Sequence, residues 1–259
     1  MILVMDLGNT QTTVALFQGE KLAHSWRLST ARHRTTDEWG ALMQSLFSLH
    51  GVAAADVRGV AVSSVVPSAD WPLRDMCRRY FDREPLFVAP GIRTGLQIVY
   101  DNPSEVGADR IATAVAAVAR YEVPAIVVDF GTATTFDMLD ESGNYLGGVI
   151  APGLGISAEA LFERAAKLPK VEIVKPRKVI GKSTVVAMQS GLYWGYVGLV
   201  EGILQRMRRE FGPVKTVVAT GGLAPLLAKD CPSVSAVDEN LILDGLRILY
   251  ERNAEREAG

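Results

Sequence analysis

The sequence predicts an α/β fold built from two related halves. Three observations support this prediction: β-type runs alternate with helical segments, a short glycine-containing loop after an apolar strand occurs twice with a spacing of 123 residues, and 259 residues, 48% of them hydrophobic, can bury a sizeable core. The spacing of the two loops places the domain boundary close to residues 115–124. We therefore expect an N-terminal domain at 1–118 and a C-terminal domain at 119–259.

The first half alternates strands with helices. Ser104 is a suitable N-cap for the alanine-rich helix that follows it, which would place Asp109 and Arg110 near the first turn of that helix. The strands are expected at 1–5, 12–18, 20–28, 57–64 and 86–88, and the helices at 36–50, 68–80 and 106–121.

The second half repeats the order of strand, loop, strand, strand and helix from residue 125. Helices are expected at 157–168 and 185–211, and a buried strand at 214–220 runs into the glycine pair at 221–222. Four glycines share one face of the long helix and favour a helix–helix contact, of which a dimer interface is one kind. These are Gly191, Gly195, Gly198 and Gly202.

Charge and composition exclude several classes of partner. A formal net charge of -2 gives no electrostatic basis for binding nucleic acid or an anionic membrane, so a small ligand is the better expectation. Cys77 and Cys231 are far apart and indicate a reducing compartment. The sequence contains neither a signal-peptide pattern nor an apolar run of ~20 residues, so we expect a soluble, cytoplasmic protein. The charged segment 251–257 is expected to be a solvated helix end.

The two loops carry the chemistry. Each follows a strand, begins with an aspartate and contains a glycine, where the backbone can approach a phosphate and threonine hydroxyls can donate to its oxygens. A single copy is a common hairpin turn, but two copies that face each other would clamp a nucleotide. From the residues alone, both leading aspartates are candidates for a hydrated Mg²⁺ ion. The loops are Asp6-Leu7-Gly8-Asn9-Thr10-Gln11-Thr12-Thr13 and Asp129-Phe130-Gly131-Thr132-Ala133-Thr134-Thr135.

These loops, together with three further motifs, resemble the type III pantothenate kinase family, within the superfamily of acetate and sugar kinases, heat-shock chaperones and actin. The resemblance covers nearly the whole chain and implies two domains of the ribonuclease H-like/actin-like ATPase type, each a mixed sheet flanked by helices. It implies transfer of a phosphoryl group from ATP to the primary hydroxyl of pantothenate, the first step of coenzyme A biosynthesis. The further motifs are Asn102-Pro103-Xaa-Xaa-Val106-Gly107-Ala108-Asp109-Arg110, the run from Gly147 to Gly153, and Thr220-Gly221-Gly222.

The resemblance also implies residue roles. ATP and Mg²⁺ would be bound by Asp6 to Thr13 and by Thr132, Asp109 would be the catalytic base, and Asp129 would be a ligand of a monovalent cation, K⁺ or NH₄⁺. This last role differs from the magnesium role that the residues alone suggest. Pantothenate would be bound by Tyr100, Gly107, Ala108, Asp109, Arg110 and Thr184, and the family habit implies a homodimer, with the partner subunit as one possible source of Thr184.

Other interpretations of these residues stay open at the level of sequence. Asp109 and Arg110 would equally suit a surface pair at a helix start, and Tyr100 would suit an aromatic residue that packs on the core. Two other functions also remain: an ATP-binding regulator without catalysis, and a phosphatase or a kinase of another acid or sugar on the same fold.

Overall fold

The computed structural model describes residues 1–254, and the last part of the charged tail expected at 251–257 lies outside the described residues. The chain divides into two compact units, Met1–Ala116 together with the segment that begins at Asn240, and Ala117–Glu239. The last helix, α7 (Leu241–Ala254), packs on β1 and β4 of the first unit. The predicted domain ranges 1–118 and 119–259 stay a prediction.

The first unit contains a five-stranded mixed sheet in the order β3-β2-β1-β4-β5. The first three strands form antiparallel pairs, whereas β4 and β5 run parallel to β1. The strands are β1 (Ile2–Leu7), β2 (Gln11–Gln18), β3 (Lys21–Ser29), β4 (Gly59–Ser64) and β5 (Leu86–Phe87).

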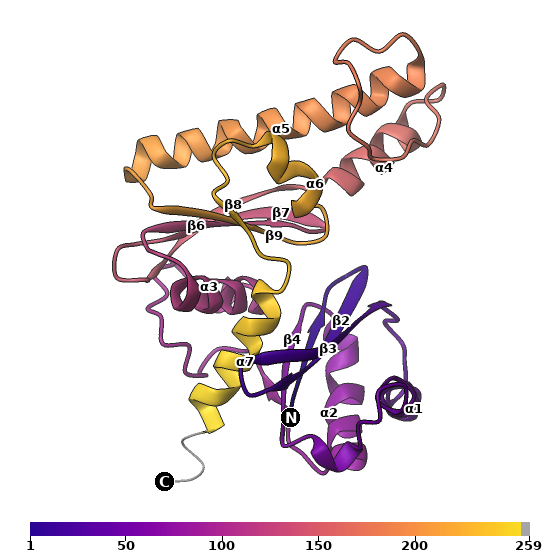
Figure 1. Cartoon of the computed structure of the whole chain (residues 1–259), viewed down its shortest axis with the longest axis vertical. Helices are drawn as coiled ribbons and strands as arrows, with labels where there is room; N and C mark the ends of the chain where they lie inside the picture. Colours follow the sequence, from indigo (N-terminus) through magenta and orange to yellow (C-terminus); the bar gives the residue numbers. More distant parts are fainter. Residues whose placement is uncertain (255–259) are drawn as a thin grey trace. The chain divides into compact units, whose positions relative to one another are not determined.

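Helices α1 (Thr36–Ser48) and α2 (Pro67–Phe81) lie side by side on one face of this sheet (Figure 1). Their apolar faces bury Trp39, Met43 and Leu73 against alternate residues of β1, β2 and β4, the pattern expected for a half-buried strand. Short 3₁₀ helices occur at η1 (Ala54–Asp56) and η2 (Pro103–Glu105).

Helix α3 (Ala108–Arg120) begins two residues later than the sequence predicts. Ser104 is not its N-cap, because the segment at 103–105 forms η2, in which the side chain of Asn102 accepts a hydrogen bond from the Ser104 N–H at 3.3 Å. The proline at 103 suits the first position of that 3₁₀ turn. Asp109 still falls in the first turn of α3, as expected.

The second unit repeats the same topology. Its sheet has the order β8-β7-β6-β9-β10, with the same pattern of antiparallel and parallel pairs as the first sheet. Mixed sheets flanked by helices in two related units confirm the predicted fold class. The strands are β6 (Ala125–Phe130), β7 (Ala133–Leu139), β8 (Tyr145–Pro152), β9 (Thr216–Thr220) and β10 (Ala236–Val237).

The long helix α5 (Thr184–Phe211) and the short helix α6 (Ala224–Leu227) lie on one face of the second sheet (Figure 1). Helix α4 (Leu154–Arg164) begins three residues earlier than predicted, directly after the strand β8. A further 3₁₀ turn, η3 (Ala228–Asp230), follows α6. The core face of α5 carries Tyr193, Tyr196 and Val200, which belong to the same core cluster as residues of β6 and β9.

Candidate active site

The first loop is the turn between β1 and β2. Asp6 lies near the end of β1, opposite Thr13, and the N–H of Gly8 donates to the carbonyl oxygen of Gln11 at 3.0 Å to close the turn. The turn residues 9–11 are exposed, whereas Thr12 is completely buried. The tip of the loop is therefore open to a ligand, while its base is fixed in the sheet.

The second loop is the corresponding turn between β6 and β7 and is one residue shorter. Asp129 lies opposite Thr135, and the Gly131 N–H donates to the carbonyl oxygen of Ala133 at 3.1 Å. Gly131 and Thr132 are exposed. The duplicated loop that the sequence predicts is therefore a duplicated hairpin, since an aspartate pairs with a threonine at the same register position in both sheets.

The glycine pair at the end of β9 lies against the second loop. Strand β9 runs parallel to β6 and places Thr220 beside Asp129. Gly221 has a φ of +87°, and a Cβ atom there would clash with the carboxylate of Asp129 and lie 2.7 Å from the carbonyl oxygen of Phe130. Glycine at this position thus allows a carboxylate oxygen and a carbonyl oxygen to gather at one point.

The segment from Gly107 to Arg110 forms the start of α3. The Asp109 side chain accepts a hydrogen bond from the Arg110 N–H at 2.9 Å, and a Cβ on Gly107 would collide with the same carboxylate oxygen. The Thr113 hydroxyl lies 3.1 Å from the carbonyl oxygens of Asp109 and Arg110. Asp109 is half-buried and Arg110 is only 8% exposed, so this helix start holds a carboxylate and a guanidinium in fixed positions.

Tyr100 and Thr184 occupy different units. Tyr100 is half-buried in the segment before η2, in the same unit as Gly107 to Arg110. Thr184 is the exposed first residue of α5 and lines a pocket of about 540 Å³ with Leu161 and Met188. The structure thus brings the first-loop residues together in one hairpin and the residues 107–110 together in one helical turn.

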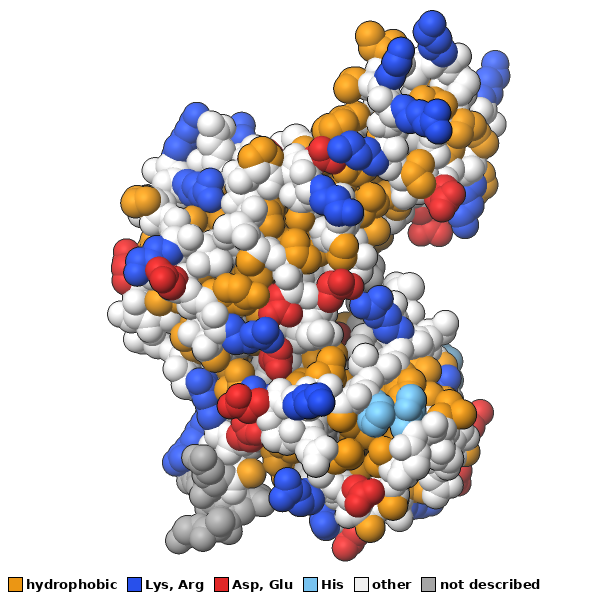
Figure 2. Space-filling view, viewed as in Figure 1, with side chains coloured by type: hydrophobic (Ala, Val, Ile, Leu, Met, Phe, Trp, Pro, Cys, Tyr) orange, Lys and Arg blue, Asp and Glu red, His pale blue; other side chains and the backbone are white. Residues whose placement is uncertain are grey.

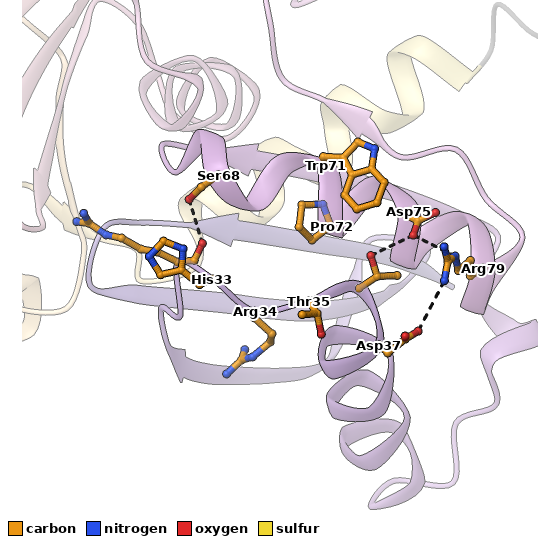
Figure 3. A pocket seen from close by; sticks show the side chains of 11 residues that line it. His33, Arg34, Thr35, Asp37, Ser68, Trp71, Pro72, Asp75 and Arg79 are labelled. Atoms are coloured by element: carbon orange, nitrogen blue, oxygen red, sulfur yellow. Dashed lines mark hydrogen bonds and ion pairs between the residues drawn. The ribbon is translucent and has the colours of Figure 1, made fainter.

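Another pocket, of about 410 Å³, lies in the first unit between residues 32–37 and α2 (Figure 3). Asp75 accepts from the Thr36 hydroxyl and pairs with Arg79 Nε, each at 3.0 Å, and Trp71 forms part of the wall. The residues predicted to bind ATP or pantothenate are not among those that line this pocket.

The loops suit cations that are bound mainly by oxygen. Mg²⁺ in phosphoryl-transfer sites is held by one or two carboxylates together with substrate phosphates, and Asp6 beside the first loop fits this requirement. Asp129 with the nearby Phe130 carbonyl suits a hard cation that prefers oxygen ligands. Within residues 1–254 no cluster of three or more His, Cys, Asp or Glu side chains could hold a metal ion.

Comparison with known proteins decides the family. The family model described as type III pantothenate kinase matches residues 2–206. The chain belongs to the type III pantothenate kinase family. A type III pantothenate kinase of Brevibacillus brevis is 53% identical over 98% of this chain and 99% of its own length. One from Geobacillus kaustophilus is 51% identical over 99% and 100%.

Solved structures support the fold. A chain described as a conserved putative Baf family transcriptional activator from Campylobacter jejuni superposes with a TM-score of 0.62 at 19% identity, over 98% of this chain and 99% of that one. The ROK hexokinase of Thermus thermophilus gives a TM-score of 0.51 at 16% identity, over 100% and 99%. At these identities the likeness concerns the fold, and it confirms the predicted actin-like ATPase architecture.

Membership of the pantothenate kinase family confirms the predicted resemblance and the predicted enzyme class, an ATP-using phosphotransferase. Among the described residues, no helix is both long and apolar enough to cross a membrane.

His24 and His50, which match no metal-ligand spacing in the sequence, lie with their ring centroids 4.3 Å apart on the first unit. Sequence reasoning missed this contact because the two residues are 26 positions apart.

Sequence reasoning also missed two residues that hold the loops. Thr30, directly after β3, hydrogen-bonds to the first loop, and Tyr196 of α5 hydrogen-bonds to Thr134 in the second. Neither residue belongs to a loop motif. A comparison of the two repeats gives no signal for Thr30, because Gly153 occupies the equivalent position. Tyr196 has no counterpart signal in the sequence either.

Proposed function

We propose that the protein transfers the γ-phosphoryl group of ATP to the primary hydroxyl of pantothenate and so forms 4'-phosphopantothenate, the first step of coenzyme A biosynthesis. The observation that carries this proposal is the full-length match to pantothenate kinases at more than half identity. The duplicated loop supports it, because phosphoryl transfer depends mostly on positioning the phosphates and neutralising their charge.

The ATP phosphates are proposed to bind to the two loops. Within the segment from Leu7 to Thr13, the exposed residues 9–11 would donate to phosphate oxygens, together with Thr132, while the Gly8 N–H and the Thr12 hydroxyl are used inside the hairpin. Asp6 would orient the hydration shell of Mg²⁺, which when bound would neutralise charge on the phosphates. The exposure of residues 9–11 and of Thr132 supports these roles, since a bound phosphate must reach them.

Asp109 is proposed as the catalytic base. Its carboxylate would accept the proton of the pantothenate hydroxyl as that oxygen attacks the γ-phosphorus. The hydrogen bond from the Arg110 N–H holds the carboxylate at the start of α3. Partial exposure leaves it accessible to a substrate.

Recognition of pantothenate is assigned to the groups around this base. Arg110 offers a planar fork that suits the pantothenate carboxylate. Gly107 and Ala108 would contribute backbone at the helix start, and Tyr100 would contribute an aromatic wall with a hydroxyl group. Thr184 would contribute from the start of α5, and its place in an open pocket supports contact with a ligand.

Asp129 is proposed to bind a monovalent cation, K⁺ or NH₄⁺, rather than Mg²⁺. The adjacent carbonyl oxygen of Phe130 and the absence of a side chain at Gly221 support an oxygen-rich site. A single carboxylate and neutral carbonyl oxygens suit an ion of low charge.

We also propose a homodimer that uses the outer face of α5. Apart from the chain neighbours and the backbone of the helix itself, no described atom lies within 4 Å of the place a Cβ would take at Gly191, Gly195 or Gly198, so this face is open. Figure 2 shows hydrophobic side chains on the surface around α4 and the start of α5. In the sequence of this region Phe162 is 42% exposed and Ile180 is 83% exposed. An exposed apolar surface of this kind is typical of an interface.

A cytoplasmic location fits the two free, buried cysteines.

The acceptor is tested with a panel of substrates. Purified protein would be incubated with ATP, Mg²⁺ and, separately, pantothenate, glucose and N-acetylglucosamine, and the products would be identified by mass spectrometry. We expect a phosphorylated product with pantothenate alone. A phosphorylated sugar with unmodified pantothenate would move the substrate to the sugar class and contradict the proposal.

A further inference from the structure

The two loops correspond at the residue pairs that flank them, although the turn of the first loop is one residue longer. In the first sheet Asp6 pairs with Thr13 and Leu7 with Thr12. In the second sheet Asp129 pairs with Thr135 and Phe130 with Thr134. Thr12 and Thr134 are therefore equivalent, and both are completely buried.

The residue that follows the third strand of each repeat holds the loop through its backbone. The N–H of Thr30, after β3, donates to the carbonyl oxygen of Thr10 at 3.0 Å. The N–H of Gly153, after β8, donates to the carbonyl oxygen of Thr132 at 3.1 Å. The same backbone contact thus fixes the tip of each loop to the neighbouring strand.

The side-chain contacts differ between the repeats. The Thr30 hydroxyl donates to the carbonyl oxygen of Gly8 at 2.7 Å and lies 2.9 Å from the Thr12 hydroxyl. Because its single proton is given to Gly8, Thr30 must accept the proton of Thr12. The Thr30 hydroxyl therefore contacts both Gly8 and the buried Thr12, and the Thr30 N–H contacts the tip of the first loop.

Gly153 cannot supply such a hydroxyl, because a Cβ there would collide with the carbonyl oxygens of Thr132 and Gly131. In the second unit the missing hydroxyl comes from Tyr196 on α5. Its phenol is hydrogen-bonded to the Thr134 hydroxyl and donates to the carbonyl oxygen of Pro152 at 3.2 Å. The side-chain hydroxyl that supports the second loop thus comes from the long helix, whereas its third strand contributes only backbone contacts.

We propose that Thr30 and Tyr196 are positioning residues that fix the two phosphate loops in the geometry that binds ATP. The inference rests on the proposed function only in taking the loops as phosphate-binding. Without either hydroxyl, a buried threonine and a carbonyl oxygen lose their partner, and the loop loses the fixed direction of its N–H groups. The energetic effect should appear in nucleotide binding, because the loop amides are the groups that contact phosphate.

The test compares Thr30→Val, which removes the hydroxyl at nearly constant volume, with Thr30→Ser, which retains it. Steady-state kinetics would be measured with ATP and pantothenate varied separately, and Mg-ADP binding would be measured by calorimetry. We expect the KM for ATP and the Kd for Mg-ADP to rise about tenfold in Thr30→Val, which corresponds to about 1.4 kcal/mol. The KM for pantothenate should change less than twofold, and Thr30→Ser should restore most of the nucleotide affinity.

Tyr196→Phe has a matched control on the same helix. Tyr193→Phe removes a phenol hydroxyl that contacts the Leu226 carbonyl oxygen and Asp230 rather than a loop. We expect Tyr196→Phe to weaken Mg-ADP binding several-fold and Tyr193→Phe to lower Tm without this weakening. In the first unit, Ser45→Ala removes a hydroxyl on the exposed side of α1 and serves as the corresponding control.

The outcomes separate this inference from the proposed function. If the wild-type protein binds Mg-ADP but phosphorylates no pantothenate, the function fails while the binding comparison still tests Thr30. Nucleotide affinity within twofold of wild type in Thr30→Val and Tyr196→Phe would overturn the positioning role, as would wild-type protein that binds no Mg-ADP. If Thr30→Val does not fold, Thr12→Val removes the other hydroxyl of the same pair and replaces it in the test.

Discussion

The carboxylate of Asp129 lies against the backbone of Gly221, the first residue after the parallel neighbour strand β9. Both features of Gly221 matter: its φ of +87° and the absence of a Cβ, which would otherwise collide with the carboxylate. The position of the proposed cation ligand is therefore set by a glycine more than 90 residues away in the sequence. A change at the end of β9 is therefore expected to move the second loop as well.

Gly221→Ala is expected to damage stability and cation activation together. The left-handed backbone costs a residue with a Cβ about 1–2 kcal/mol, and the Cβ would also push Asp129 away from the Phe130 carbonyl. Thermal unfolding and the dependence of turnover on K⁺ concentration would measure the two effects. Gly222→Ala is the matched control, because nothing lies within 4 Å of its Cβ position. Equal behaviour of the two variants would refute the assigned contact.

Asp109→Asn is expected to lower kcat by about 10²- to 10⁴-fold, the usual contribution of a general base. The amide keeps nearly the same volume, so the KM values should change little. Kinetics with saturating ATP and pantothenate would measure the loss. Asp82→Asn, on an exposed turn of the first unit, controls for the general loss of a carboxylate. Near-normal turnover of Asp109→Asn would rule out the base assignment.

Asp129→Ala is expected to remove the activation of turnover by K⁺ while the dependence on Mg²⁺ remains. Rates would be measured across K⁺ and Mg²⁺ concentrations at constant ionic strength, with Glu141→Gln as an exposed control in the same unit. If the variant keeps its response to K⁺ and fails to respond to Mg²⁺, Asp129 is a magnesium ligand, as its motif alone suggests.

Asp230 should contribute to the acid sensitivity of the second unit. Hydrogen bonds from Lys175 Nζ at 2.7 Å and from the Tyr193 hydroxyl at 2.5 Å lower the pKa of this carboxyl. Since the folded-state pKa lies below the unfolded value of about 3.9, the stabilisation is present above that pH and is lost as pH falls through the folded-state pKa.

Urea unfolding at neutral pH and at pH values below about 4 would reveal this contribution. Asp230→Asn is expected to be less stable than wild type at neutral pH and to approach it in acid. A difference between the two proteins that stays constant across the pH range would show that the ion pair has no part in acid unfolding.

The sequence predicted the features that are local and repeated. Residues 6–13 and 129–135 follow apolar strands and carry their turn chemistry within a few positions, so the residue pattern alone is enough to place both hairpins. The first residue of α3 was harder to predict from the sequence. Ser104 and Asn102 are both good N-caps, and the 3₁₀ turn at Pro103 decides which of them acts as a cap. Local preference alone could not separate them.

Contacts between distant elements could not be predicted. The sequence pattern predicts that Tyr196 is a buried aromatic residue of a helix. Only the packing of α5 on the second sheet brings its hydroxyl to Thr134. The amphipathic pattern of α7 shows that one face is buried but not that it packs on β1 and β4. In both cases the pattern determines the buried face, while the fold determines the partner.

The central claim, that this chain is a pantothenate kinase that needs a monovalent cation, is tested most directly by coupled ADP release. Purified protein with ATP and Mg²⁺ would be assayed with and without pantothenate, first in K⁺ and then in Na⁺ buffer. The account predicts ADP release that depends on pantothenate and is much faster in K⁺. ADP release that is unchanged by pantothenate, or none in K⁺ buffer, would contradict it.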